Sequence, residues 1–563
     1  MATNVMTTPN GAFVEYLNTL HNVSANNQSA ITELSITNPY FVKTMVQREV
    51  GKAIKESLEN KPAHIFVLTG HAGDGKTGLL FQTLQAWKVI DNGASLGLTG
   101  LVSLPSGNKL RYVKDFSELS ADDRVACLKR AMDECAQGIS TFLVANTGPL
   151  ILGFEACFSS EVQNQLIEAI DSNDGQVKQY DGVPVSVINV ATIDNSTFVK
   201  PFLKNLLSEE LWSPCKTCEK KDYCVIYSNR CIIEQSSERV SDFITKHYVF
   251  QQEYGQKLTI RQIVAHLSYS ITGGLNCPNI KNSERAKFNY LFTNNFFGYK
   301  GVHANKEAQI MKAVSDVAHA EYDHKRLRAD ETLFIKGDLS SVFTKQIATL
   351  LSEEGLRCHH SEAWQRAVRR AYMFLNIDTS ETTQKYLVQD VFSMWFPRYL
   401  QLRNGQSATS GDKELIQDAL QMIFTESIVG KEKEIPITMK RENGVSQSVQ
   451  LVYDSLPKKK IKIEQSSIVD YSNTKRYRLF ISVNGEKINT ALSLPLFDYF
   501  EEIRRGAIAT NIDPMLSQGI DSLKAQIISF CESDKPEIEL LTLSDDGWDS
   551  VTAEYDTGDW KIG

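Results

Sequence analysis

Short apolar runs alternate with segments of helical spacing along residues 41–208, as expected of a sheet with helices packed on it. Each run is four to nine residues long and is rich in β-branched or aromatic side chains, which favours a buried strand. The predicted strands are Ile65–Leu68, Leu98–Leu104, Leu110–Phe116, Ser140–Gly148 and Val183–Ala191. Because strands that alternate with helices form parallel sheets, we expect an α/β core with a five-stranded, doubly wound parallel sheet.

The pattern changes on both sides of this core. Helical spacing before it predicts a short helix near Phe13–Leu20 and a longer one over Asn38–Asn60. Residues 281–430 read as mostly helical, whereas strand patterns dominate after Lys431. The predicted C-terminal strands are 434–440, 448–456, 476–494 and 538–544, with a hairpin turn at Asn484-Gly485 and helices near 496–505 and 512–530.

These patterns divide the chain into five parts. They are an N-terminal lead-in over residues 1–40, the core over 41–208, a cysteine-rich insert and helical lid over 209–280, a helical domain over 281–430, and a β-rich C-terminal interaction domain over 431–563. A chain of 563 residues is long enough for several domains with their own cores.

A glycine-rich motif connects the first predicted core strand to the next helix. Gly70, Gly75, Lys76 and Thr77 fit the pattern G-x-x-x-x-G-K-[ST] of a P-loop. Glycines let backbone N–H groups surround phosphates, the lysine reaches the β- and γ-phosphates, and the threonine hydroxyl binds Mg²⁺. We therefore expect ATP and Mg²⁺ as ligands, held by Gly70, His71, Ala72, Gly73, Asp74, Gly75, Lys76, Thr77 and Gly78.

Hydrolysis of ATP also needs a carboxylate near Mg²⁺ and a polar group that orients water. Asp115, at the end of a strand, is the first choice for the magnesium side, and Glu118 for the water; Asp194 is a weaker competitor. Asp115 could instead cap a helix. Asn146 ends another strand and would sense the γ-phosphate, or simply form a turn.

Two further features carry candidate chemistry outside the core. Arg261, on a predicted helix, could close over the γ-phosphate or remain a solvated surface residue. Four cysteines have the spacing C-x₂-C-x₅-C-x₆-C, which favours Zn²⁺ over an iron–sulfur cluster or free thiols. They are Cys215, Cys218, Cys224 and Cys231.

Composition restricts the class of protein. Hydrophobic residues make up 42% and charged residues 23% of the chain, as in ordinary globular proteins. No long apolar run or signal peptide is evident, so we expect a cytoplasmic protein without a membrane span. The net charge of −8 argues against a globally basic DNA-binding protein. Local phosphate contacts remain candidates at Lys458, Lys459, Lys460, Lys462, Arg366, Arg369 and Arg370.

The order of P-loop, acidic strand end, Asn146 and the helix around Arg261 resembles the AAA+ branch of P-loop ATPases. More narrowly, the A-G-D-G-K-T loop, the LVANTGPL strand, the cysteine insert and the LTIRQIVAHLSYSITGG helix look like the ATPase of phosphorothioation-dependent DNA restriction systems, the DptF-like proteins. This resemblance covers roughly the first 375 residues. It implies a role in a bacterial restriction or antiphage complex, with other defence subunits, DNA and further copies of the chain as candidate partners.

One departure from the AAA+ pattern affects this expectation. AAA+ rings usually carry an arginine finger between the Asn146 strand and the last core strand, but residues 147–183 contain no arginine. The finger would then come from elsewhere, for example from a partner. The expected function is ATP hydrolysis coupled to DNA or to partner subunits, with a low-turnover signalling switch and a DNA-translocating or repair motor as alternatives. No nuclease motif was found.

Overall fold

The structure is a computed structural model that describes most of the chain. Contacts between residues divide it into two compact units, residues 1–392 with 469–474, and residues 393–468 with 475–563. The five smaller parts expected from the sequence stay a prediction. The described residues are 11–21, 38–91, 96–301, 303–425, 433–439, 449–469, 475–483, 485–506, 512–531, 537–544, 547–556 and 559–562.

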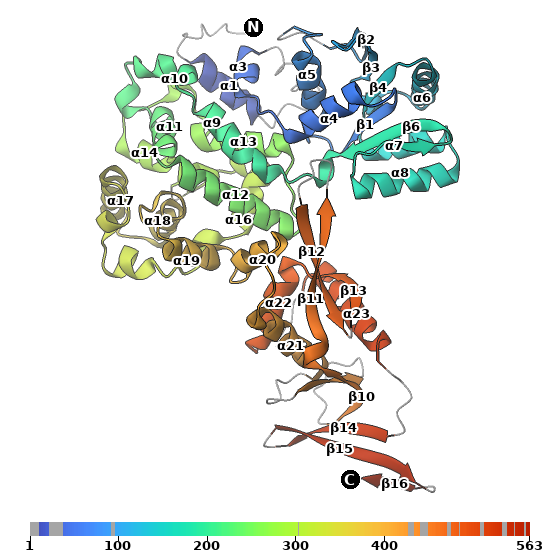
Figure 1. The fold of residues 1–563 in the computed structure, drawn as a ribbon. Helices are drawn as coiled ribbons and strands as arrows, with labels where there is room; N and C mark the ends of the chain where they lie inside the picture. Colours follow the sequence, from blue (N-terminus) through green and yellow to red (C-terminus); the bar gives the residue numbers. More distant parts are fainter. Residues whose placement is uncertain are drawn as a thin grey trace. The chain divides into compact units, whose positions relative to one another are not determined.

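The first unit contains a mixed sheet of six strands, which lies with its own helices to one side of the mostly helical remainder of that unit (Figure 1). Its spatial order is β2-β3-β4-β1-β6-β5. The four strands β3, β4, β1 and β6 are parallel, whereas β2 runs antiparallel to β3, and β5 antiparallel to β6. The bounds are β1 Ile65–Thr69, β2 Thr99–Ser103, β3 Lys109–Val113, β4 Ser140–Val144, β5 Lys178–Tyr180 and β6 Val183–Asn189.

All five predicted core strands are present, but the expectation that all of them are parallel is wrong. Residues 104–108 connect β2 to β3 through a tight turn in which the Leu104 N–H donates to the Asn108 carbonyl over 2.8 Å. A parallel pair needs a crossover of a dozen or more residues, so this connection forces a hairpin. The sixth strand, β5, joins β6 through Asp181-Gly182, which have φ values of 48° and 82° and form a two-residue hairpin turn.

Helices cover both faces of this sheet. Alternate residues of β1 point to opposite faces, so Phe66 and Leu68 pack against one helical layer and Ile65 and Val67 against the other. The first layer contains α4 (Glu49–Asn60) and α5 (Lys76–Ala86). The second contains α6 (Ala121–Ala136), α7 (Thr147–Glu155) and α8 (Ser160–Ser172). The core is therefore an α/β/α sandwich.

The chain order makes β1 the point where the strand connections change direction. After β1 the chain builds β2, β3 and β4 on one side of β1, and it then places β6 on the other side. The carboxyl ends of β1, β3, β4 and β6 meet at one edge of the sheet. In open α/β sheets, ligands bind at this edge where the connections diverge.

The predicted helix over residues 38–60 is interrupted. Residues 45–48 separate α3 (Pro39–Thr44) from α4, and Met45 has an extended backbone at φ −62° and ψ 138°. The break places Arg48 at the N-cap of α4. The apolar spacing that predicted one helix is thus divided between two shorter helices.

The remainder of the first unit is mostly helical, as predicted, with one small hairpin of β7 (Tyr299–Lys300) and β8 (His303–Ala304). Its further helices are α1 Ala12–Leu20, α9 Val199–Leu206, α10 Glu209–Lys216, α11 Val225–Gln235, α12 Ser237–Glu253, α13 Ile260–Thr272, α14 Glu284–Asn289, α15 Phe292–Phe296, α16 Lys312–His319, α17 Lys345–Arg357, α18 Glu362–Leu375 and α19 Glu381–Val391.

The second unit carries the predicted β-rich region in two separate antiparallel sheets. The expected hairpin is confirmed by the pairing of Val483 with Glu486, although Asn484 lies outside the described residues. Its strands are β9 Glu434–Met439, β10 Val449–Pro457, β11 Ile461–Val469, β12 Lys475–Val483, β13 Glu486–Ala491, β14 Glu537–Ser544, β15 Gly547–Asp556 and β16 Asp559–Ile562. Its helices are α20 Phe396–Arg403, α21 Ser410–Thr425, α22 Leu494–Arg504 and α23 Pro514–Ser529.

A helix that crosses a membrane must be both long, at about 20 residues, and predominantly apolar. None of the described helices meets both criteria.

Candidate functional site

The loop between β1 and α5 is shaped by glycines and by one buried carboxylate. Gly70, Gly73 and Gly75 have φ values of 149°, 91° and 78°, which favour glycine over other residues. A Cβ atom on Gly70 would lie only 2.7 Å from the Val190 side chain. Within the loop, the buried Asp74 carboxylate accepts a 2.8 Å hydrogen bond from the N–H of the exposed His71. These contacts fix the loop at the carboxyl end of β1.

Lys76 begins α5 and turns its ammonium group back into this loop. The Nζ atom donates to the carbonyls of Gly70 and His71 at 3.1 and 2.8 Å and to Asn146 Oδ1 at 2.8 Å. Burial lowers the pKa of Lys76, Asp74 and Asp115 raise it, and Arg261 lowers it further. The structure therefore brings together four of the predicted residues, Lys76, Asn146, Asp115 and Arg261.

Asp115 has two neighbours that explain its position. Its carboxylate accepts a 2.9 Å bond from the Ser117 N–H, so it caps the single turn of 3₁₀ helix Phe116–Glu118. The alternative interpretation of Asp115 as a helix cap is thus confirmed. The same carboxylate also raises the pKa of Lys76. The Ser117 hydroxyl accepts a 2.8 Å bond from the Asn146 N–H and ties the end of β3 to the end of β4. Ser117 was not predicted from the sequence.

The other two predicted acids lie in different surroundings. Glu118 is exposed at the end of the same 3₁₀ turn. The carboxylates that raise the pKa of Lys76 are those of Asp74 and Asp115. Asp194 caps a second 3₁₀ turn, Asn195–Phe198, by accepting from the Ser196 N–H at 2.9 Å. Asp115 is therefore the best placed of the three acids for a role beside the loop.

The remaining loop residues are accessible or half-buried. Ala72 is exposed, and Thr77 is half-buried in the first turn of α5. A Cβ atom on Gly78 would meet no atom within 4 Å, so no steric reason requires glycine there. The predicted role of Thr77 as a magnesium ligand stays a prediction.

The start of α13 packs directly on the loop. The Arg261 N–H donates to the Gly73 carbonyl at 3.1 Å, and a Cβ atom on Gly73 would lie 3.0 Å from Thr259 Oγ1. Thr259 and Gln262 form a reciprocal capping box that fixes this first helical turn. Burial lowers the pKa of Arg261. The helix predicted to close over the nucleotide thus contacts the loop through its N-terminal turn.

Arg48 is a site residue that the sequence analysis missed. Its Nη1 donates to the Asp74 carbonyl at 2.8 Å, and its Nη2 lies 3.5 Å from Asn195 Oδ1. Asn195 in turn donates to the Leu258 carbonyl at 2.9 Å, next to the start of α13. Arg48 is separated from the motif by a helix and a strand, so no sequence signal pointed to it.

The centre of α13 is anchored by a buried histidine. His266 is 0% exposed and lies between the Tyr248 hydroxyl, 2.8 Å from Nδ1, and the Phe296 carbonyl, 2.9 Å from Nε2. Because a carbonyl only accepts, Nε2 carries the proton and Nδ1 accepts from the tyrosine. Burial lowers the pKa of His266 to about 4.

This anchor predicts a loss of stability in acid. The pKa of His266 is near 6.5 in the unfolded chain but about 4 in the folded one, so the unfolded state binds more protons between these values. The free energy of unfolding should fall by about 3 kcal/mol from this residue as the pH drops through that window. Urea unfolding at several pH values measures this. His266→Gln should flatten the slope, whereas the exposed-site control His303→Gln should keep it; equal slopes in all three would contradict the prediction.

The predicted metal ligands lie around the end of α10 and the start of α11. The Cys218 N–H donates to the Cys215 carbonyl at 3.3 Å, and Cys224 is the N-cap of α11. Burial and the thiols of Cys224, Cys277 and Cys218 raise the pKa of Cys215 to about 12. Among the described residues, no three His, Cys, Asp or Glu side chains already stand in metal-binding geometry. The zinc site, with the iron–sulfur cluster as its alternative, stays a prediction.

The three arginines of α18 that were candidates for DNA contact form internal ion pairs. Arg370 is 1% exposed and lies 2.6 Å from Asp323, which also pairs with Arg366 at 3.2 Å. Arg369 pairs with Asp330 at 2.8 Å. These ion pairs hold α18 against residues 323–330 and bury Arg370, whereas phosphate contact at the half-buried Arg366 and Arg369 stays a prediction.

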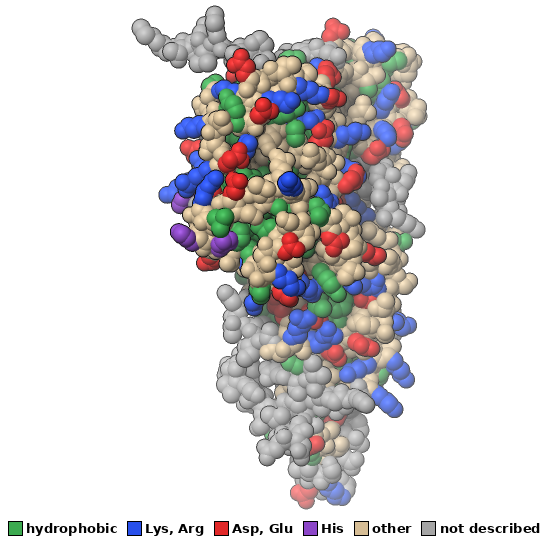
Figure 2. Space-filling model, turned by 90° about the vertical axis from the view of Figure 1, so that its left-hand side faces the viewer, with side chains coloured by type: hydrophobic (Ala, Val, Ile, Leu, Met, Phe, Trp, Pro, Cys, Tyr) green, Lys and Arg blue, Asp and Glu red, His purple; other side chains and the backbone are tan. Residues whose placement is uncertain are grey.

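The lysine candidates in the second unit differ from these arginines. Lys459, Lys460 and Lys462 are exposed and Lys458 is half-buried, so DNA contact there stays a prediction. Basic and acidic side chains are interspersed over the face shown in Figure 2. The described residues on that face do not form one continuous basic surface.

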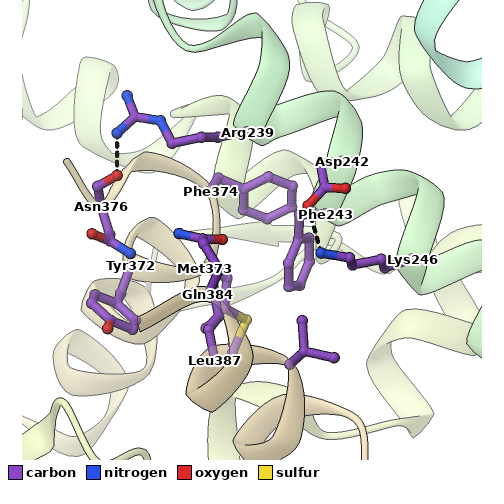
Figure 3. Close-up of a pocket in the computed structure, with 11 residues that line it drawn as sticks. Arg239, Asp242, Phe243, Lys246, Tyr372, Met373, Phe374, Asn376, Gln384 and Leu387 are labelled. Atoms are coloured by element: carbon purple, nitrogen blue, oxygen red, sulfur yellow. Dashed lines mark hydrogen bonds and ion pairs between the residues drawn. The ribbon is translucent and has the colours of Figure 1, made fainter. Parts of the chain in front are cut away.

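Two hollows among the described helices involve none of the loop residues. The pocket in Figure 3 lies between α12 and the segment from α18 to α19, where Lys246 pairs with Asp242 at 2.7 Å and Arg239 donates to the Asn376 carbonyl. Its volume of about 10 Å³ admits no more than a water molecule. A larger hollow of about 520 Å³ is lined by α11, α14 and α17. The smaller pocket is therefore not a nucleotide site.

The chain was compared with models of protein families, with curated proteins and with solved structures, and none of these comparisons gave a match. Any assignment of function therefore depends on the residues and contacts described above.

Proposed function

We propose that this chain binds ATP and Mg²⁺ at the loop 70–77 and hydrolyses the ATP. The observation that carries this proposal is the convergence of Lys76, Asn146, Asp115 and Arg261 on a glycine-rich loop at the carboxyl ends of the parallel strands of the mixed sheet. A triphosphate carries several negative charges. It would be stabilised here by the positive N-terminus of α5, by backbone N–H groups of the loop and by the Lys76 ammonium group.

Each residue has a defined task in this proposal. Lys76 exchanges its loop carbonyls for phosphate oxygens and neutralises the charge that develops during phosphoryl transfer. Thr77 and Asp115 hold Mg²⁺, directly or through water. Asn146 orients the attacking water or the γ-phosphate from the end of β4. Glu118 is a weaker choice for water activation than its sequence position suggested, since it is exposed.

The contact between α13 and the loop supports a second element of the proposal, a nucleotide-dependent switch. The bond from the Arg261 N–H to the Gly73 carbonyl joins the first turn of α13 to the loop. Any change in the loop on γ-phosphate binding or release would shift this turn. Coupling through α13 is also compatible with the alternative of a signalling switch with little turnover.

We further propose that the switch serves a bacterial DNA restriction or antiphage complex, with other defence subunits as partners. This part rests on the resemblance of the loop, the Asn146 strand, the cysteine insert and the α13 helix to DptF-like ATPases. The lack of arginine over residues 147–183 supports a catalytic arginine supplied from elsewhere in the chain or by a partner.

ATPase assays with and without DNA separate the candidate functions. Stimulation by DNA supports the restriction or motor role, and stimulation by a co-purified partner supports an arginine supplied in trans. Tight ATP binding with turnover near zero under every condition supports the signalling switch. Absence of ATP binding would contradict all three.

Arg261→Ala offers a specific test of the switch. We expect ATP affinity to change only a few-fold, because Lys76 and the loop remain, while DNA- or partner-stimulated turnover falls about 10-fold or more. The backbone bond to Gly73 survives the substitution, so α13 stays in place. Steady-state kinetics beside an ATP titration measures the two effects. Unchanged stimulated turnover would contradict a role for this side chain.

A further inference from the structure

A fifth cysteine lies beside the cysteine turn, although it is distant in the sequence. Cys277 follows α13 in a single 3₁₀ turn, Cys277–Asn279. The Lys220 Nζ donates to the carbonyls of Cys277 and Pro278 at 3.0 and 3.5 Å. Since Lys220 is two residues after Cys218, these bonds hold the Cys277 segment against the loop that carries Cys218.

The electrostatic contacts between the thiols agree with this placement. Burial raises the pKa of Cys277, and the thiols of Cys224 and Cys218 raise it further. The pKa of Cys215 is likewise raised by burial and by the thiols of Cys224, Cys277 and Cys218. All four side chains are half-buried, as ligands of a site near the surface would be. The four thiols, which come from three separate segments, therefore lie within electrostatic range of one another.

Cys231 has a different environment. It lies in the second turn of α11, where burial and the Cys231 thiol raise the pKa of the Tyr227 hydroxyl. Cys224, by contrast, is the N-cap of α11, where the backbone N–H groups of Tyr227 and Ile226 lower its pKa against the larger effect of burial. N–H groups directed at a cysteine sulfur orient and stabilise a metal-bound thiolate.

We propose that Cys215, Cys218, Cys224 and Cys277 bind one Zn²⁺, and that Cys277, not Cys231, is the fourth ligand. Zn²⁺ prefers four tetrahedral thiolates in structural sites, and a C-x₂-C pair such as Cys215 and Cys218 commonly supplies two of them. The metal also offsets the repulsion among thiolates brought together by the fold.

The proposed site adds a connection that the sequence spacing did not suggest. Cys277 follows the C-terminal end of α13, and the N-terminal end of that helix contacts Gly73. Asn18 of α1 holds the same region through a 3.0 Å bond from its side chain to the Leu275 carbonyl. Zinc would therefore fix the end of α13 opposite the loop. This inference does not depend on ATP binding.

Two matched variants test the choice of ligand. Zinc and iron are measured by elemental analysis after anaerobic purification of the full chain from zinc-supplemented medium. Wild type and Cys231→Ser should each contain about one zinc per chain, whereas Cys277→Ser should lose most of it or bind it at least about 10-fold more weakly. Full zinc in Cys277→Ser, loss of zinc in Cys231→Ser, or wild-type protein with iron or without metal would each overturn the proposal.

Alkylation of the native wild-type protein gives a readout that does not depend on a variant folding. With the metal bound, mass spectrometry should find Cys215, Cys218, Cys224 and Cys277 protected from a thiol reagent and Cys231 modified at least about 10-fold faster than they are. A chelator should release the zinc and make all four reactive. Protection of Cys231 together with rapid modification of Cys277 would overturn the assignment.

Discussion

Replacing Lys76 with alanine is expected to weaken ATP binding by about 100-fold or more and to remove measurable hydrolysis. The ammonium group is buried in the loop and donates to three oxygens, and alanine leaves that position without a charge or a donor. Equilibrium titration with a fluorescent ATP analogue measures the first effect, and phosphate release measures the second.

An exposed lysine provides the matched control for this experiment. Lys52→Ala removes a charge whose ion pair with Glu49 is exposed, and we expect it to change neither affinity nor turnover. Thermal unfolding should show that Lys76→Ala remains folded. Wild-type affinity in a folded Lys76→Ala protein would contradict the assignment of the loop.

The second large effect is expected at Asp115. Asp115→Asn should lower turnover about 100-fold or more while ATP binding changes much less, because it removes the charge that would hold Mg²⁺. Asparagine also caps helix N-termini, so the bond from the Ser117 N–H and the turn itself should survive. Phosphate release over a range of Mg²⁺ concentrations measures the loss.

Glu118→Gln serves as the comparison for Asp115→Asn. The Glu118 side chain is exposed, and we expect its loss to reduce turnover only a few-fold. If Glu118→Gln abolishes hydrolysis while Asp115→Asn retains it, the assignments of the two acids must be exchanged. That result would restore the role that sequence position alone suggested for Glu118.

The positions of five of the six core strands could be read from the sequence because each contains a short, largely apolar run, whereas β5, Lys178–Tyr180, is too short and polar to be predicted. The strand directions could not be read in this way, since direction depends on the connections. The turn at residues 104–108 and the Asp181-Gly182 pair are short enough to force hairpins, and both are visible in the sequence as turn signals. They were the available evidence that β2 and β5 run antiparallel to their neighbours.

Some residues of the candidate site could likewise be predicted from the sequence, and others could not. Glycines, Lys76 and the strand-end residues Asp115 and Asn146 lie in or beside recognisable motifs. Arg48 and Cys277 reach their places only through the packing of α4 and the end of α13, and they carry no local pattern. The arginines of α18 show the opposite case, because they were candidates for phosphate contact but form ion pairs with Asp323 and Asp330 within the fold.

Hydrogen exchange of the full chain, measured with and without a saturating, slowly hydrolysed ATP analogue and Mg²⁺, tests the central claim most directly. We predict slower exchange in peptides that cover residues 70–78, together with a smaller effect at residues 259–262, where α13 begins against the loop. Lys76→Ala should lose both effects. Unchanged exchange over residues 70–78 in the wild-type protein at saturating nucleotide would contradict the account.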